Sequence, residues 1–331
     1  MNPLARRQIP SSGCNCKSFC TCSTVPSRGF ALSMATLFVG VVMFITAIPS
    51  FCHGEEGDDL PKVLRAGFLA RIVSDVDPRD AQATIELLTR EVSRNMGLRT
   101  SPKVTLFTST KSMIEAYCHG DLDMVSMPTI DYMRLRNTVS MIPAFVARHN
   151  NGVGTQYALI TCRDSGIKSI AGLKGKTLIM PPVNKHEAGH LWLNVLLREN
   201  PATFFHQLKE FAKQNQAIMG VFFRQADGAL VTRAGLDAAR QLNPQLDQRL
   251  LVIAESSNLS DGVTCFPPTT SEKTRRVLSN AINLLSSSDT GRQLFMIFQT
   301  NGVVPFNPVY LEGLETLLKE QRRLKIKATT R

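Results

Sequence analysis

The stretch at 158–197 constrains the fold more than any other part of the 331-residue chain. Two apolar runs, at 158–162 and 176–180, predict strands, and the Gly-punctuated segment between them predicts a turn and a short helix over 165–173. A Pro-Pro pair then precedes a long helix. The free backbone N–H groups of a first helical turn converge at such a place, and the helix dipole adds positive charge. The sequence therefore predicts an anion-binding corner at the start of this helix.

Strands and helices alternate through the rest of the chain as well. A strand over 63–70 leads to a helix that begins at Asp77-Pro78, with Asp as the cap and Pro at the first helical position. Apolar side chains then recur at helical spacing, at Ile85, Leu88, Val92 and Met96. This alternation predicts an α/β fold with mostly parallel sheets flanked by helices.

The length of the chain suits two lobes rather than one domain. We expect a first lobe over 61–155, a second lobe over 156–256, and a return to the first lobe over 257–331 with C-terminal helices and a basic tail. Two crossover segments would then join the lobes and leave a cleft between them. Ligands of α/β sheets bind beyond the carboxyl ends of the strands, so loop residues at this cleft are the expected contacts.

Residues 1–54 differ in kind from the rest of the chain. They contain four basic residues, no acidic residue and an apolar run at 30–51. The pattern is typical of a signal peptide, and the run is also long enough for an N-terminal membrane anchor. Either interpretation places the following residues in the periplasm or on the extracytoplasmic face of a membrane.

The cysteines predict neither a metal site nor a disulfide scaffold. Four of them lie close together in the first segment, at Cys14, Cys16, Cys20 and Cys22, without the spacing of a zinc ribbon or finger. If residues 1–54 are removed, Cys118, Cys162 and Cys265 remain, and three cysteines allow at most one disulfide.

The charge of the chain favours an acidic small molecule as partner. The formal net charge is +11, and +7 remains without the four cations of residues 1–54. No nucleic-acid reader motif and no basic stripe interleaved with aromatic residues accompanies this charge. We expect a solvated basic surface, no nucleic-acid partner and a small anionic solute.

Four segments resemble one known family in their order and spacing. They are "HGDLDMVSMPTIDY" at 119–132, "DSGIKSIAGLKGKTL" at 164–178, "QADGALV" at 225–231 and "RLLVIAESSNLSDG" at 249–262. They are similar to the phosphonate-binding family of periplasmic solute-binding proteins, the receptors of ABC importers, over about Val63 to Pro308. The resemblance implies the two-lobed type 2 periplasmic-binding-protein fold. It also implies a monomer that works with an ABC transporter permease, without cofactor or catalysis, or alternatively a membrane-anchored ligand-sensing ectodomain with a signalling partner.

Loops that start helices carry most of the candidate ligand contacts. Three such loops, at 109–112, 128–132 and 184–190, would face the cleft, and two further positions follow strands at 71 and at 232–233. The resulting candidates are Arg71, Ser109, Thr110, Thr129, Tyr132, Asn184, His186, His190, Thr232 and Arg233.

Several of these positions depart from the pattern of the resembled family. Its third loop is a hydroxyl-rich S-T-S-G turn that holds phosphonate oxygens, whereas here His186, Glu187 and Ala188 precede Gly189. A carboxylate at that place would repel a dianion. The family's cleft tyrosine is replaced by Thr110.

The acidic residue that serves the ligand's amine in the family is also missing, since Thr232 or Arg233 stands in its place. A guanidinium there would suit a carboxylate or another anion without an amino group. An ordinary surface position explains Arg233 equally well, and the same holds for Arg71.

The segment from His186 to His190 also satisfies HExxH, the motif of zinc metalloproteases, with Glu210 as a possible third ligand. The Pro-Pro pair upstream would place the motif in a first helical turn, whereas zinc proteases embed it in a longer helix, so we expect no enzyme. Within a binding protein the two imidazoles could hold a metal that binds the anion, or bind the anion themselves when protonated. An incidental pair of cleft or surface histidines is the third interpretation.

Overall fold

The structure, a computed structural model, describes residues 60–73, 77–95, 97–150, 152–211 and 213–324. The predicted signal peptide or anchor, the cysteines of residues 1–54, Met96 and the end of the basic tail lie outside these residues. No helix among the described residues combines the length and the apolar character that crossing a bilayer requires.

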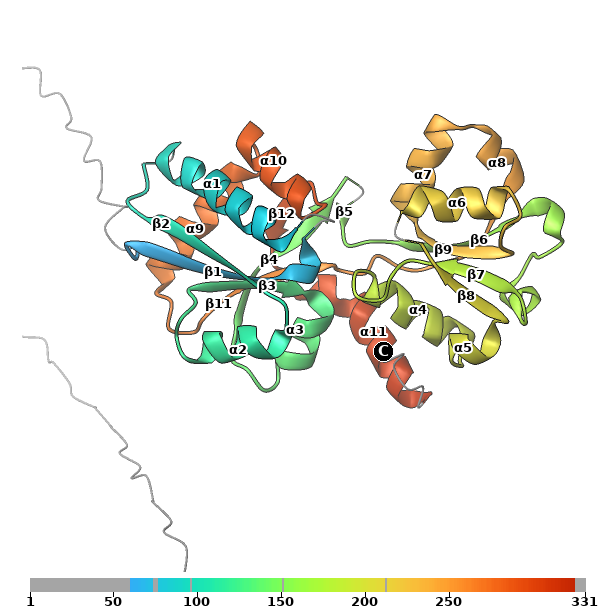
Figure 1. Cartoon of the computed structure of the whole chain (residues 1–331). Coiled ribbons are helices and arrows are strands. Elements are labelled where there is room, and N and C mark those ends of the chain that lie inside the picture. Colours follow the sequence, from blue (N-terminus) through green and yellow to red (C-terminus); the bar gives the residue numbers. More distant parts are fainter. Residues whose placement is uncertain (1–59, 74–76, 96, 151, 212, 325–331) are drawn as a thin grey trace, which may run out of the picture. The chain divides into compact units, whose positions relative to one another are not determined.

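One sheet and its helices form what we call the first lobe (Figure 1). Its strand order is β12 (Gly302–Pro305), β4 (Ile142–His149), β11 (Gly262–Phe266), β3 (Met124–Pro128), β1 (Val63–Leu69) and β2 (Ser101–Phe107), with β5 (Gly152–Val153) paired to β4. Three helices cover one face: α1 (Pro78–Asn95), α9 (Glu272–Leu285) and α10 (Asp289–Ile297). The other face carries α2 (Thr110–Cys118) and α3 (Thr129–Leu135).

The remaining sheet and its helices form the second lobe. Its strand order is β10 (Leu250–Glu255), β6 (Tyr157–Cys162), β9 (Gly228–Thr232), β7 (Thr177–Met180) and β8 (Gln207–Glu210). One face packs against α6 (Gln214–Phe222), α7 (Arg233–Leu242) and α8 (Gln245–Arg249), and the other against α4 (Glu187–Leu197) and α5 (Pro201–Phe204). The last helix, α11 (Glu312–Arg323), follows the 3-10 turn η4 (Pro308–Leu311) and packs against α4.

The predicted α/β architecture with two sheets and flanking helices is confirmed, but the sheets are mixed rather than mostly parallel. In the first lobe β1, β2 and β3 pair in parallel, whereas β11 is antiparallel to both β3 and β4. In the second lobe β7, β8 and β9 are parallel, and β6 is antiparallel to both of its neighbours. The antiparallel strands include β4, β6, β10 and β11, which flank the two crossings between the sheets. Two consecutive parallel strands of one sheet need a crossover connection, usually a helix. A strand that enters the sheet directly from the other lobe has no such connection, so the βαβ pattern does not predict its direction.

Local sequence explains where individual elements begin and end. Asp77 accepts a hydrogen bond from the Arg79 backbone N–H at 2.8 Å, which confirms the predicted start of α1. The helix expected over 165–173 is instead two 3-10 turns, η2 (Arg163–Ser165) and η3 (Ile170–Leu173), because Gly166 at φ 75° ends the first of them. All six residues of β6 are buried, as the continuous apolar run and the helices on both faces require.

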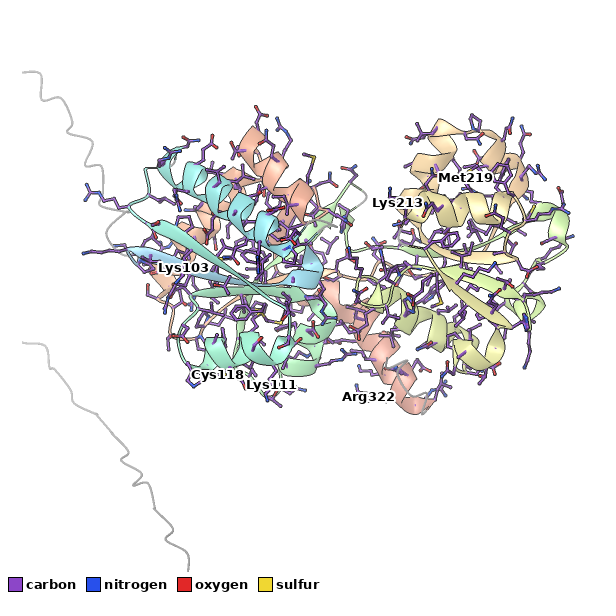
Figure 2. All side chains as sticks on the ribbon, in the orientation of Figure 1. Lys103, Lys111, Cys118, Lys213, Met219 and Arg322 are labelled. Carbon is purple, nitrogen blue, oxygen red and sulfur yellow. The ribbon has the colours of Figure 1, made fainter. Side chains whose placement is uncertain are left out.

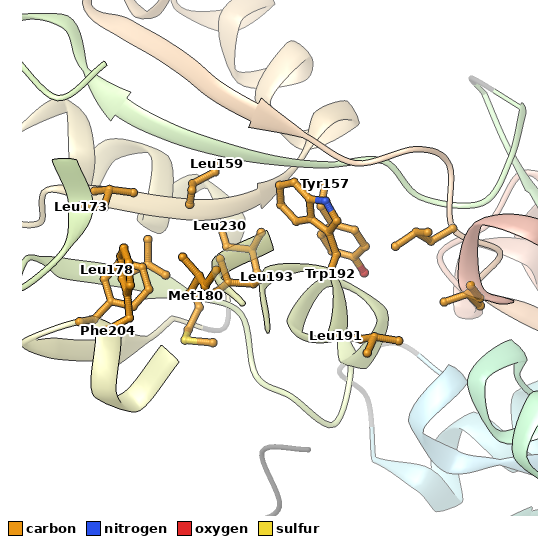
Figure 3. Packing of buried hydrophobic residues seen from close by; sticks show 14 of the residues in the cluster. Tyr157, Leu159, Leu173, Leu178, Met180, Leu191, Trp192, Leu193, Phe204 and Leu230 are labelled. Carbon is orange, nitrogen blue, oxygen red and sulfur yellow. The ribbon is translucent and has the colours of Figure 1, made fainter. Parts of the chain in front are cut away.

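The largest apolar cluster lies between the second sheet and α4 (Figure 3). Tyr157 of β6 and Trp192 of α4 face each other there, and Leu159, Leu178 and Leu193 are fully buried. Leu314 of α11 joins the same cluster, so the end of the chain contributes to the packing around α4.

Basic residues are exposed on several elements of both lobes (Figure 2). Lys103 of β2 and Lys111 of α2 are exposed in the first lobe, Lys213 is exposed at the start of α6, and Arg322 is exposed on α11. This distribution matches the solvated basic surface that the composition suggests.

Candidate functional site

The two segments that cross between the sheets are paired with each other. Thr155 and Leu259 exchange backbone hydrogen bonds of 2.8 and 3.0 Å, which form an isolated antiparallel bridge. Gly154 makes this approach possible, because it adopts φ 86° and a Cβ atom there would lie 2.5 Å from the Leu259 carbonyl oxygen. We call residues 154–156 and 256–261 the crossing segments.

Asp261 organises the side chains of the crossing segments. Its Oδ2 atom accepts hydrogen bonds from Thr155 Oγ1 at 2.9 Å and from His149 Nε2 at 2.7 Å. The hydrogen bond from the imidazole to the carboxylate raises the pKa of His149 above its ordinary value. Next to this group, the hydroxyls of Thr129 and Ser260 are 3.0 Å apart and buried.

The start of α4 lies beside these segments. His186 is the residue that precedes α4, so the HExxH residues occupy the first turn of the helix, as the upstream prolines predicted. Gly189 is required there, since a Cβ atom would lie 2.5 Å from the buried ring of Tyr157. The Tyr157 ring also meets the His186 ring edge to face, with its hydroxyl 3.3 Å from Nδ1.

Glu187 connects this helix start to the first lobe. Its carboxylate accepts from Arg71 Nη1 at 2.9 Å and from Arg134 Nη2 at 2.6 Å. Arg71, in the 3-10 turn η1 (Ala70–Ile72) after β1, also pairs with Asp131, whose side chain is only 5% exposed. Two guanidinium groups thus hold the carboxylate of the first residue of α4, and guanidinium groups placed in this way are suited to binding an anion.

Both histidines of the motif are held neutral by burial. Burial lowers the pKa of His186 to about 4. His190 is 4% exposed, and burial lowers its pKa as well. Its Nε2 atom lies 2.7 Å from the Pro181 carbonyl oxygen, an acceptor, so this nitrogen carries the proton and donates it.

These contacts do not fit a zinc site. The Nε2–H group of His190 is engaged with a backbone carbonyl, and the Glu187 carboxylate lies between two guanidinium groups rather than beside a free position. Among the described residues, no three His, Cys, Asp or Glu side chains gather as metal ligands.

A cavity of about 320 Å³ opens at this place, and segments of both lobes line it. Its polar lining includes Arg71, His149, Asn184, Lys185, His186 and Asp261. From there it continues between the first sheet and the helices α1, α9 and α10, where its lining is mostly apolar.

The cavity brings together three of the residues suggested by the sequence, namely Arg71, Asn184 and His186. Thr129 is fully buried beside the crossing segments. His190 is turned to the Pro181 carbonyl, and Tyr132 packs in the first lobe's core with its ring edge against Phe306.

The other four suggested residues stabilise helix starts or surface pairs. Ser109 caps α2 by accepting from the Ser112 N–H, and Thr110 begins that helix. Thr232 caps α7 and donates to Gln214 at 2.7 Å. Arg233 pairs with Asp237 and Glu255.

Sequence reasoning missed Arg134, Asp131, His149, Asp261 and Tyr157. Asp131 and Arg134 lie in the helix α3 together with Tyr132, so the sequence pointed to their neighbourhood but not to these two side chains. His149 and Asp261 are far apart in sequence and meet only because the crossing segments pair, which no local pattern reveals.

Two α/β lobes joined by paired crossing segments, with a cavity that both lobes line, define a two-lobed binding protein. The chain belongs to the phosphonate-binding family, described as "ABC transporter, phosphonate, periplasmic substrate-binding protein", whose model matches residues 71–309. The family is one of transport proteins that bind a substrate outside the cytoplasm, which confirms the resemblance found in the sequence. No curated protein matches the sequence as a relative.

Solved structures of low sequence identity share the fold. XAC2383 from Xanthomonas citri bound to ATP is 17% identical, with a TM-score of 0.56 and coverage of 80% of this chain and 98% of that one. PhnD1 from Prochlorococcus marinus in complex with methylphosphonate is 15% identical, with a TM-score of 0.52 and coverage of 80% and 99%. The periplasmic aliphatic sulphonate binding protein SsuA from Escherichia coli is 15% identical, with a TM-score of 0.50 and coverage of 81% and 95%. They support the type 2 periplasmic-binding-protein fold.

Proposed function

We propose that this protein captures a small anion in the cavity at the start of α4 and delivers it to the permease of an ABC transporter. The observation that carries the proposal is the position of Glu187, the first residue of α4, whose carboxylate is held by Arg71 and Arg134. The guanidinium groups that bind this side-chain carboxylate can also bind the oxygens of a ligand's carboxylate, sulfonate or phosphonate group. Of the three structures compared above, one holds ATP, one holds methylphosphonate and one is named for aliphatic sulphonates, and each of these molecules carries oxyanion groups.

The proposed ligand contacts are Arg71, Asn184 and His186, with Arg134 added. Arg71 and His186 approach the cavity from different lobes, so a ligand between them would contact both. Neutral His186 offers a hydrogen bond rather than a charge, and the arginines supply the positive charge. Arg233, whose guanidinium is taken up by Asp237 and Glu255, is left out of the site.

A thermal-shift screen with phosphate, methylphosphonate, methanesulfonate and short carboxylates tests the proposal. A bound anion at a hundredfold excess over its Kd adds about 2.7 kcal/mol of stability. Arg71→Gln should weaken the tightest of these anions about tenfold or more, since a charge-assisted pair is lost. Arg233→Gln is the matched control and should leave the affinity unchanged. If none of the anions stabilises the protein, or if both variants lose affinity equally, the proposed site is wrong.

We further propose that the protein works as a monomer at the extracytoplasmic face, released or tethered by residues 1–54. N-terminal sequencing of the exported protein distinguishes the two. A free start near Glu55 supports a released receptor for a transporter. An intact N-terminus supports the tethered alternative, a membrane-anchored sensor with the same ligand site.

A further inference from the structure

The core of the first lobe is divided on one face of its sheet. Between this face and the helices α1, α9 and α10, the buried side chains form two separate clusters. One contains Ile85, Leu294 and Phe295, and the other contains Phe266 and Leu278. On the opposite face a single cluster spans β1, β3, β11 and the helices α2 and α3.

The cavity described above occupies the space between these two clusters. Ile85, Leu278, Leu285 and Phe295 line it, and so do the strand residues Leu64, Ala66, Phe68 and Met124. Leu64, Phe68 and Met124 lie on central strands under helices, yet they are only half-buried. Their remaining exposed surface faces the cavity. The space between the sheet and the helices is therefore not filled by side chains here, and apolar side chains surround it.

The Ser and Thr side chains along this apolar part have hydrogen-bond partners within the protein. Ser126 of β3 and Thr264 of β11 bond to each other at 2.7 Å. On α1, Thr89 donates to the Ile85 carbonyl at 2.6 Å and Ser93 donates to the Thr89 carbonyl at 3.0 Å. A buried water needs two to four polar partners, and apolar cavities without them stay dry and take up apolar molecules. The interior of the first lobe is therefore suited to hydrocarbon rather than to water.

The apolar space and the charged groups belong to one cavity. At one end the lining includes His186, which precedes α4, and Arg71 of η1. Phe68 at the end of β1 and Ile72 of η1 line it next, and the lining then continues into the interior of the first lobe. We propose that the ligand is an amphiphilic anion, a sulfonate, phosphonate or carboxylate whose alkyl chain enters the first lobe between α1, α9 and α10. This inference rests on the proposed function, since the anionic head would occupy the site at Arg71.

The volume of the cavity sets the size of the chain. An apolar cavity of about 150 Å³ holds benzene. This cavity has about 320 Å³, part of which belongs to the polar end. A chain of about six to ten carbon atoms is therefore the expected occupant. Each methylene that leaves water for the cavity should tighten binding about fourfold until the space is full.

Isothermal titration of the full chain with methane-, butane-, hexane-, octane- and decanesulfonate tests the inference. Affinity should rise about fourfold per methylene and then level off. Equal affinity for methanesulfonate and decanesulfonate would overturn the inference and leave the proposed function standing. If no sulfonate binds, and the anion screen finds no ligand either, the proposed function fails together with the inference. Binding of 1-decanol as tightly as decanesulfonate would also overturn it, because the anionic head would then contribute nothing.

A substitution that fills the cavity gives a second test. Ala281 of α9 lines the apolar part, and Ala281→Phe should keep the methanesulfonate affinity while weakening decanesulfonate about tenfold or more. Its Tm should not fall, because the new ring enters empty space. The matched control is Ala239→Phe on α7, a buried alanine of the packed second lobe, which should lower the Tm. Unchanged decanesulfonate binding by a folded Ala281→Phe variant contradicts the inference. If the variant does not fold, the alkanesulfonate series on the wild-type protein is the deciding test.

Discussion

Glu187 is the residue whose charge most affects the proposed site. Its carboxylate is held by Arg71 and Arg134, so a ligand anion competes with it for the same guanidinium groups. Glu187→Gln keeps the shape of the side chain and removes the competing charge. We expect about tenfold tighter binding of methanesulfonate and methylphosphonate, measured by titration calorimetry. Glu115→Gln on the exposed face of α2 is the control and should change nothing. Weaker binding by Glu187→Gln would mean that Glu187 itself contacts the ligand.

His186 should make the protein sensitive to acid. Burial lowers its pKa to about 4, so the unfolded chain, with a pKa near 6.5, binds a proton more readily than the folded protein does. Stability is thus lost as pH falls from about 6.5 through 4. Allowing for screening at a half-buried ring, this loss is about 1 to 2 kcal/mol between pH 7.5 and pH 5.

Urea unfolding of His186→Gln at both pH values measures this loss, because the variant should be less sensitive to acid by that amount.

His149 contributes to the pH dependence of stability in the opposite sense. Its raised pKa stabilises the folded state below about pH 6.5, and this stabilisation is lost as pH rises through the folded pKa. The exposed His206→Gln is the control. An equal pH dependence in wild type and His186→Gln would show that the ring titrates normally.

The helix α4 depends on a glycine for its contact with β6. Alanine usually stabilises a helix relative to glycine by up to about 1 kcal/mol. At position 189, however, the added methyl would meet the buried Tyr157 ring at 2.5 Å. We expect the clash to prevail, so Gly189→Ala should lower the free energy of unfolding by about 1 to 3 kcal/mol in urea titrations. In a double-mutant cycle with Tyr157→Leu, the cost of Gly189→Ala should largely disappear. Additive effects would exclude the ring as the cause.

The elements differ in how far the sequence predicts them. The start of α1 and the buried strand β6 follow from patterns within a few residues, and both were predicted. The antiparallel pairing of β11 with β3 and β4 joins residues more than a hundred positions apart, and no local pattern encodes it. The same limit applies to the site. Arg71 was suggested because it directly follows a strand, whereas its pairing with Glu187 depends on how α4 meets the first lobe.

The cavity shows the limit of sequence reasoning for the whole molecule. Leu64, Phe68 and Ile85 fit the apolar pattern of a filled core, and their spacing gives no sign that the core is divided in two. Whether apolar side chains fill the space between a sheet and its helices depends on the distance between them, which the periodicity of single elements does not determine.

Ligand binding should change the separation of the two lobes. A ligand that takes the place of Glu187 at Arg71 and Arg134 replaces a contact between the lobes by contacts of its own, and two crossing segments allow hinge motion. Spin labels at Lys103→Cys in the first lobe and Lys213→Cys in the second report this separation by pulsed electron resonance (Figure 2). For this purpose Cys118 and the cysteines of residues 1–54 are replaced by serine, while Cys162 and Cys265 are buried.

The expected result is a shifted distance distribution for the pair at 103 and 213 when a saturating anion from the screen is added. The matched control pair, Lys103→Cys with Lys111→Cys, lies within the first lobe and should give the same distribution with and without the anion. A shift in both pairs would indicate rearrangement inside the lobe rather than hinge motion. If neither pair shifts while calorimetry on the same sample records binding, the lobes are held rigidly, and the anion reaches its site without displacing Glu187 from the two arginines.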